Sequence, residues 1–212
     1  EAMGKALFKN INSDSKPQTV ASKVSVDLVS NPEKLDSENV AAFIKGSEKP
    51  DEIIVISAHL DHEGVKNGEV YNGADDDGSG TVGILEIAEA FKKAADDGYT
   101  PKRSILFLHV TGEEKGLLGS RYYTDIDPIF PLANTMVNLN LDMIVRVDAR
   151  HEEDRNYVYI IGSDMLSTEL HTVSEDVNKK YSNITLDYTY NNETDPNRYY
   201  YRSDHYNFAI NG

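Results

Sequence analysis

The sequence predicts an α/β fold in which helices cover both faces of a central sheet. Three short segments, residues 53–57, 105–111 and 135–141, are apolar and rich in β-branched residues. Such segments are typical of buried parallel strands. Stretches with helical periodicity lie between them, and alternation of strands with helices indicates a sheet with helices on both faces.

The other elements follow from the same periodicities. Residues 2–10 are predicted as a short helix, and residues 11–19, rich in Asn, Ser, Asp and Lys, as a linker. Residues 20–29 alternate apolar and polar side chains, which predicts a half-buried strand, with residues 39–44 as its neighbour.

The second half of the chain continues the alternation. The clearest helix is residues 80–96, which Gly98 ends, and a shorter one follows at 117–123. Residues 157–161 are predicted as a strand and residues 167–180 as a helix. Residues 208–212 have the composition of a last helical turn with its glycine cap, so we expect the C-terminal end of the domain to be absent.

Length and composition limit the possible classes of protein. The 212 residues suit one domain, residues 1–212, with the helix and linker of residues 1–19 at its start. The 21 Lys and Arg residues against 36 Asp and Glu residues give a formal net charge of −15, which disfavours nucleic-acid partners and anionic membrane surfaces. The longest apolar runs are too short to insert into a membrane. Because there is no cysteine, disulfides, thiolate metal ligands and thiol catalysis are excluded.

Acidic and histidine residues directly follow each of the three apolar strands. Because ligands bind at the carboxyl ends of parallel strands, these side chains are expected to converge. A fourth acidic loop, residues 72–80, precedes the long helix and belongs to the same edge if the strand–loop–helix order is kept. The side chains that follow the three strands are His59, Asp61, His62, Glu113, Glu114 and Asp142.

Each motif has a simpler interpretation when it is taken alone. The three aspartates of residues 75–77 are compatible with a solvated turn, and Glu113 with Glu114 is compatible with an exposed helix start favoured by the helix dipole. Asp142 differs, because a carboxylate that ends an apolar strand is costly to bury without a partner. Residues 75–86 nearly match a calcium loop, but that motif needs a preceding helix, and no helical period precedes it here.

Five motifs taken in order resemble the di-zinc aminopeptidases of the aminopeptidase S and leucyl aminopeptidase group. That family also includes glutamate carboxypeptidases and, more distantly, glutaminyl cyclases. The resemblance implies a three-layer fold with a mostly parallel mixed sheet that lacks its C-terminal strand and helix here. The motifs are SAHLDH at 57–62, GADDDGSG at 73–80, TGEEKGLLGS at 111–120, NLDM at 140–143 and RSDH at 202–205.

The resemblance also implies roles for the site residues. His59 and Asp142 are expected to bind one zinc, and Asp76 to bridge it to a second zinc bound by Glu114. Glu113 is expected to be the general base. A mixed set of imidazole and carboxylate ligands favours zinc over magnesium or calcium.

Three further residues are expected beside the metals rather than on them. The Asp61 carboxylate is expected to orient the His59 ring, and Asp77 to follow Asp76 through a cis peptide bond. His205 is expected near the site without binding zinc. The family's last zinc ligand, a histidine preceded by a tyrosine, lies downstream of the RSDH motif, so we expect two zinc ions in the complete domain but one full site in this chain.

The favoured function is therefore a zinc-dependent aminopeptidase that acts on peptide substrates, in a secreted or periplasmic setting. A metallo-carboxypeptidase would need a basic cluster for the substrate carboxylate, which Arg198 and Arg202 could supply. Two further alternatives are a one-zinc glutaminyl cyclase of the same fold and a non-catalytic binding domain, which predicts lost ligands.

Overall fold

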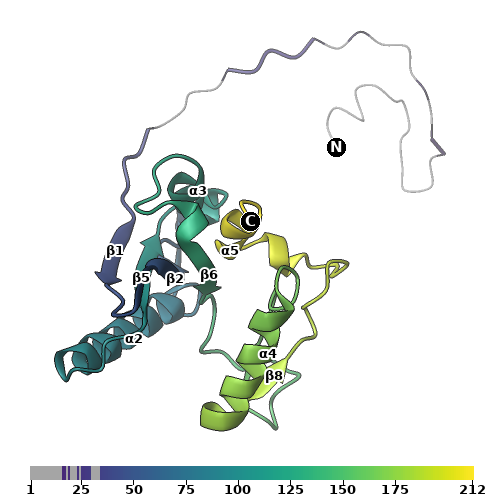
Figure 1. Cartoon of the computed structure of the whole chain (residues 1–212). Helices are drawn as coiled ribbons and strands as arrows, with labels where there is room; N and C mark the ends of the chain where they lie inside the picture. The colour runs from purple at the N-terminus through teal and green to yellow at the C-terminus, as the bar shows by residue number, and fades with distance from the viewer. Residues whose placement is uncertain (1–15, 18, 20–22, 24, 30–33) are drawn as a thin grey trace. The chain divides into compact units, whose positions relative to one another are not determined.

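A computed structural model of the chain describes residues 16, 17, 19, 23, 25–29 and 34–212. The chain divides into two units, Glu1–Asp36 and Ser37–Gly212, and every helix and strand described lies in the second (Figure 1). The predicted helix at 2–10 and much of the predicted strand at 20–29 fall outside the described residues. Residues 25–29 are described, but they are exposed and form no strand.

The strands are β1 (Val40–Ile44), β2 (Lys49–His59), β3 (Gly64–Lys66), β4 (Glu69–Tyr71), β5 (Arg103–Val110), β6 (Thr135–Asn140), β7 (Tyr157–Tyr159) and β8 (Thr185–Asp187). The helices are α2 (Gly78–Asp96), α3 (Leu118–Asp125), α4 (Thr168–Val177) and α5 (His205–Ala209). Short helical turns lie at Glu113–Lys115, Leu132–Asn134, Asn178–Ser182 and Tyr199–Tyr201.

The central sheet has the strand order β1-β5-β2-β6. β2 runs parallel to β5 and to β6, whereas β1 runs antiparallel to β5, so the predicted mostly parallel mixed sheet is confirmed. The register pairs His59 with Val110 and Ser57 with Asn140. Because the three parallel strands end at nearly the same level, the loops that follow them begin side by side.

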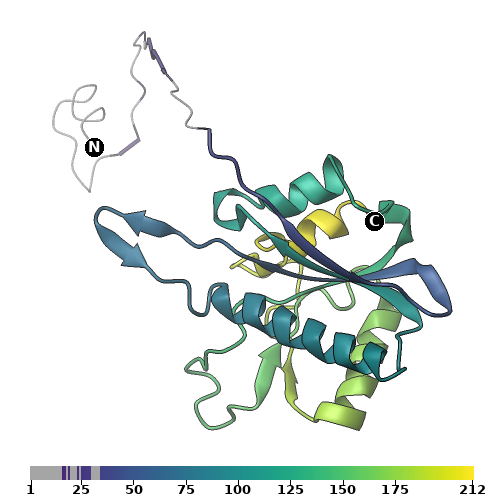
Figure 2. The same ribbon diagram turned by 90° about the vertical axis from the view of Figure 1, so that its left-hand side faces the viewer.

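Two separate cores show that helices cover both faces of the sheet. One core joins Val55 and Leu108 of the sheet to Tyr123 of α3 and Phe208 of α5. The other packs the opposite face, including Phe107, against the buried side of α2. Figure 2 shows α2 on one side of the sheet and the pair α3 and α5 on the other. The predicted three-layer arrangement is confirmed.

β6 differs from the prediction that it is buried like β2 and β5. Met136 is 55% exposed and Leu139 42% exposed. In the described part of the chain β6 pairs only with β2, so its other edge has no strand beside it. An apolar segment on an edge strand leaves part of its side chains uncovered even though its composition matches that of a central strand.

Two small two-stranded sheets, β3-β4 and β7-β8, were only partly predicted from the sequence. A hairpin joins β3 to β4 through Asn67 and Gly68, both with positive φ. β7 pairs in parallel with β8, which the sequence analysis did not predict.

The structure also bears on the calcium-loop alternative. Because strand β4 precedes the acidic loop at residues 72–77, the helix that a calcium-binding loop needs before it is absent at this described position. In the described part of the chain, no helix combines the length and apolar character needed to cross a bilayer.

Candidate metal centre

The loops after β2, β5 and β6 meet the start of α2 at one edge of the sheet. Two groups of side chains there place one possible ligand atom each within 4.8 Å of the others. The first group is His59, Asp77 and Asp142, and the second is His62, Asp76 and Glu114. The convergence expected from the strand order is therefore present, and it includes one residue, His62, to which the sequence analysis gave no role.

The His59 ring is held with one nitrogen turned toward the acidic residues. The side chain is 1% exposed, and its Nδ1 lies 2.8 Å from the main-chain oxygen of Asp61. On the other side of the ring, Nε2 lies 3.1 Å from Asp76 Oδ1 and 3.8 Å from Asp142 Oδ1. Nε2 and Asp142 Oδ1 are both buried without a hydrogen-bond partner. These two atoms are thus available to a ligand at the site.

A chain of hydrogen bonds along β6 sets the direction of the Asp142 carboxylate. Ser203 donates to Asp142 Oδ2 at 2.7 Å, and the Asn140 amide donates to the Ser203 hydroxyl at 2.8 Å. Ser57 of β2 donates in turn to Asn140 Oδ1. Burial raises the pKa of Asp142, but the His59 ring and the Ser203 hydroxyl outweigh it and hold that pKa below the ordinary value.

Asp76 and Asp77 have different surroundings although they are neighbours. One oxygen of Asp76 faces each histidine, with Oδ1 3.1 Å from His59 Nε2 and Oδ2 3.9 Å from His62 Nδ1. Asp77 is 2% exposed, and its two oxygens accept backbone N–H groups from His59, Gly80 and Met143. The peptide bond between them is cis, as the resemblance implies. Asp77 lies close enough to belong to the first group, but both of its carboxylate oxygens already accept hydrogen bonds from main-chain N–H groups.

Asp61 makes a different contact from the one predicted. Its main-chain oxygen, not its carboxylate, is the partner of His59 Nδ1, because Oδ1 lies 3.9 Å from that nitrogen. The carboxylate instead accepts the backbone N–H groups of Glu113 at 3.1 Å and Glu114 at 3.3 Å. One residue therefore ties the loop after β2 to the loop after β5.

Glu113 and Glu114 begin a short helical turn, and both line one hollow. Glu114 Oε1 is buried and lies 2.7 Å from His62 Nδ1. The hollow, of about 700 Å³, is also lined by Leu117, Arg202 and Tyr206. Burial raises the pKa of Glu113 to about 8, with His59 opposing the rise and Asp204, among other carboxylates, adding to it.

Two residues of the RSDH motif lie near the centre but outside both groups. Asp204 is fully buried, accepts a hydrogen bond from Ser120 at 2.5 Å, and has its pKa raised to about 6 by burial. Burial lowers the pKa of His205, whose Nε2 has no hydrogen-bond partner. Neither metal-ligand group among the described residues includes His205.

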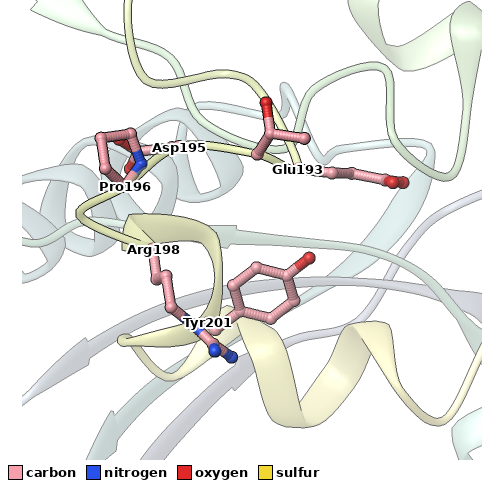
Figure 3. A pocket seen from close by; sticks show the side chains of 6 residues that line it. Glu193, Asp195, Pro196, Arg198 and Tyr201 are labelled. Atoms are coloured by element: carbon pink, nitrogen blue, oxygen red, sulfur yellow. The ribbon is translucent and has the colours of Figure 1, made fainter.

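Both arginines of residues 195–202 lie over aromatic rings. The Arg198 guanidinium lies 4.9 Å from the centre of the Tyr201 ring, and that of Arg202 lies 5.5 Å from the Tyr199 ring. Figure 3 shows Arg198 beside Tyr201 in a hollow of about 450 Å³ that Asp195 and Glu193 also line. The two arginines lie in different hollows, because Arg198 lines this one and Arg202 lines the hollow beside Glu113 and Glu114.

The donor atoms suit a transition metal. Four buried atoms without hydrogen-bond partners, from four residues, face the centre of the site. Imidazole nitrogen with carboxylate oxygen is a donor set that zinc accepts readily, whereas magnesium and calcium prefer oxygen alone. The four atoms are His59 Nε2, His62 Nδ1, Glu114 Oε1 and Asp142 Oδ1.

A model of peptidase family M28 matches residues 39–212, which include every residue of the two groups. The chain belongs to peptidase family M28. A probable leucine aminopeptidase 2 of Aspergillus oryzae is 37% identical over 126 residues, which are 58% of this chain and 23% of that protein. A probable glutamate carboxypeptidase of Arabidopsis thaliana is 32% identical over 108 residues, 51% of this chain and 15% of that protein.

Solved structures of M28 type share the fold. The zinc aminopeptidase BSAP from Bacillus subtilis superposes with a TM-score of 0.60 and 28% identity, covering 81% of this chain and 37% of that one. A glutaminyl cyclase from an Acidobacteriales bacterium gives a TM-score of 0.55 at 19% identity, which shows the fold alone. The chain thus spans less than half the length of BSAP and less than a quarter of the Aspergillus oryzae protein.

Proposed function

We propose that this M28 chain carries the catalytic centre of a zinc-dependent aminopeptidase. The observation that supports this most directly is the set of four buried, unpartnered donor atoms at the carboxyl edge of the sheet, next to Glu113. A buried polar atom without a partner is costly, and a bound metal ion removes that cost. A binding domain without catalysis would have no need to retain both histidines and all the acids.

We assign the ligands as follows. His59 and Asp142 would hold one zinc and Glu114 a second, and Asp76 would serve both because each of its oxygens faces a different histidine. When bound, a pair of zinc ions polarises a substrate carbonyl and makes a bound water acidic at neutral pH. Asp77 and the Asp61 carboxylate keep the loops in place through their hydrogen bonds to the main chain.

Glu113 is the proposed general base. It follows the same strand as Glu114 and is anchored by Asp61 through its backbone N–H. A pKa near neutrality lets a carboxyl group take a proton from water and return it to the leaving amine. In the metal-free chain burial raises the pKa of Glu113 to about 8, and the positive charge of bound zinc would bring it down toward neutrality.

An aminopeptidase fits the charges around the site better than a carboxypeptidase. An aminopeptidase must bind a free α-amino group, which is a cation, and the centre is lined by carboxylates. A carboxypeptidase needs a cluster of cations for the substrate carboxylate; Arg202 lines the hollow beside Glu113, but Arg198 lies in a separate hollow, over the Tyr201 ring.

Four related pentapeptides distinguish the candidate activities. The zinc-loaded protein is incubated with a free leucine-initiated pentapeptide, its N-acetylated form, its C-amidated form and a glutamine-initiated form. We expect release of leucine from the free and C-amidated peptides and none from the N-acetylated one. Cleavage that needs the free carboxylate, or formation of pyroglutamate without hydrolysis, would contradict the proposal.

A further inference from the structure

Two buried polar side chains beside the centre have no part in the proposed function. They are Asp75 in the acidic loop, 8% exposed, and Ser79 in the first turn of α2, 7% exposed. We propose that both are positioning residues, which hold the segment after Asp142 against the acidic loop and thereby set the distance between the Asp142 and Asp76 carboxylates. This inference rests on the proposed function, because it concerns how two ligands of the same centre are brought together.

The contact consists of three consecutive main-chain N–H groups, each of which donates to a side chain of the acidic loop or the start of α2. The three pairs are Met143 with Asp77 Oδ1 at 3.3 Å, Ile144 with Ser79 Oγ at 3.0 Å, and Val145 with Asp75 Oδ1 at 3.2 Å. Successive N–H groups of this kind form a concave surface that binds oxygen atoms. The segment after β6 is therefore fastened at every residue from 143 to 145.

The Ser79 hydroxyl links the two segments to each other. Its Oγ donates to the main-chain oxygen of Asp75 at 2.6 Å while it accepts the N–H of Ile144. Asp76 directly follows Asp75, and Ile144 stands two residues after Asp142. One hydroxyl thus connects the main chain beside one ligand to the main chain beside the other.

The backbone directly after Asp142 has a conformation that its own residue does not favour. Met143 has φ of +59°, in the left-handed region that residues with a Cβ seldom adopt. Contacts with the rest of the fold are needed to keep a residue there. The hydrogen bonds of Ile144 to Ser79 and of Val145 to Asp75 follow it directly and supply such contacts.

The placement of the two carboxylates decides whether they can share an ion with His59. Asp76 Oδ1 lies 3.1 Å and Asp142 Oδ1 lies 3.8 Å from His59 Nε2, although the two aspartates belong to different loops. Zinc binds carboxylate oxygen at about 2.0–2.2 Å, so movement of either loop by about 1 Å would take an oxygen out of reach. Fastening one loop to the other therefore contributes to zinc affinity.

The test separates the hydrogen bond of Asp75 from its charge. Asp75→Asn keeps an oxygen that can accept the N–H of Val145 but carries no charge, whereas Asp75→Ala removes both. Zinc dissociation constants are measured by competition with chelators of graded affinity, on protein that circular dichroism shows to be folded. We expect Asp75→Ala to raise the dissociation constant by about 10- to 100-fold, as is typical when an outer contact of a metal site is lost, and Asp75→Asn to stay close to the wild type.

A second variant and a second measurement keep a positioning role distinct from a structural one. Ser79→Ala removes the acceptor of the Ile144 N–H and should raise the dissociation constant by a similar factor, so the test remains available if Asp75→Ala does not fold. In the cobalt(II)-loaded protein, the visible absorption reports ligand geometry and should change in both alanine variants but not in Asp75→Asn. A side chain that only stabilised the fold would lower the free energy of unfolding of the zinc-free chain and leave both measurements unchanged.

The exposed Asp51→Ala is the matched control, because it changes the net charge equally and should bind zinc as the wild type does. Equal losses of affinity in Asp75→Asn and Asp75→Ala would overturn the inference, since the charge and not the hydrogen bond would then be responsible. Wild-type affinity in both Asp75→Ala and Ser79→Ala would overturn it as well. Both results leave the proposed function standing, whereas a wild-type protein that binds no zinc would refute the proposed function itself.

Discussion

The two nitrogens of His59 have separate tasks. Nδ1 contacts the Asp61 main-chain oxygen, so the ring is held in one orientation and Nε2 is left facing Asp76 and Asp142. Fixing the second nitrogen of a metal-binding histidine in this way raises the basicity of the first. The Asp61 carboxylate is then free to hold the main chain of Glu113 and Glu114.

At the residue scale, Glu113→Gln separates catalysis from metal binding. Loss of the base should lower kcat for peptide hydrolysis by about 10²- to 10⁴-fold, and zinc content should stay unchanged, because Glu113 is not among the grouped donors. Stopped assays and elemental analysis on the same samples measure both. The exposed Glu89→Gln serves as control, and a Glu113 variant with full activity would remove it as the base.

Ser203→Ala tests whether the hydrogen-bond chain along β6 positions Asp142. The change removes the donor to Asp142 Oδ2 and the acceptor for the Asn140 amide. Zinc affinity at the position of His59 and Asp142 should fall about 10- to 100-fold, as is typical when the partner of a metal ligand is lost. Chelator competition measures it, with the exposed Ser182→Ala as control. Unchanged affinity would show that the strand alone orients Asp142.

At the element scale, the start of α2 must come very close to the loop after β6. Asp77 caps the helix by accepting the N–H of Gly80, and the same carboxylate accepts the N–H of Met143. A Cβ on Gly80 would overlap the Leu141 carbonyl and lie 2.6 Å from both carboxylate oxygens of Asp77. The helix can therefore bring Asp76 to the site only if its third residue has no side chain.

Two glycines of α2 provide a matched test of this contact. Gly80→Ala should lower the free energy of unfolding by about 1–3 kcal/mol, the usual cost of overpacking. Gly83→Ala meets only side-chain methyl groups, the nearer at 3.3 Å, so it should be neutral or raise stability by up to about 1 kcal/mol through helix propensity. Urea unfolding measures both. Equal effects at the two positions would contradict the close contact.

At the scale of the whole molecule, the acidic centre links stability to pH and to metal. Burial opposes protonation of His59, but the carboxylates of Asp142 and Asp77 raise its pKa to about 10. Burial also raises the pKa of Asp77 to about 7 and that of Glu113 to about 8. All three groups therefore hold more protons in the folded chain than in the unfolded one over the range between their ordinary and raised values.

Zinc-depleted protein should accordingly lose stability as the pH rises from 5.5 to 8.5. The contribution of His59 is complete below about pH 6.5, the ordinary value, and is lost as the pH rises toward 10, while ionisation of Asp77 and Glu113 adds a cost in the same direction. Zinc binds the deprotonated ligands, so its stabilising effect should grow over the same range. Urea unfolding at three pH values, with zinc and with chelator, tests this. A zinc-depleted chain that becomes more stable toward pH 8.5 would contradict it.

The local sequence pattern was sufficient to predict the central sheet, the main helices and most of the donor residues. Periodicity marks β2, β5, α2 and α3, since burial on a sheet or helix repeats along the chain, and strand order alone brings His59, Glu114 and Asp142 to one edge. The edge position of β6 and the exposure of Met136 could not be predicted, because the composition of a strand does not show what lies beside it.

Tertiary structure decided what each side chain at that edge contacts. His62 stands three residues after His59 in the same motif, which was the available signal, but whether it faces Glu114 depends on the left-handed backbone of Gly73 and on the path of two separate loops. The use of the Asp61 carboxylate on the Glu113 main chain likewise joins residues 52 positions apart. Covalent sequence determines which groups can reach the site, whereas loop conformation determines which atoms meet there.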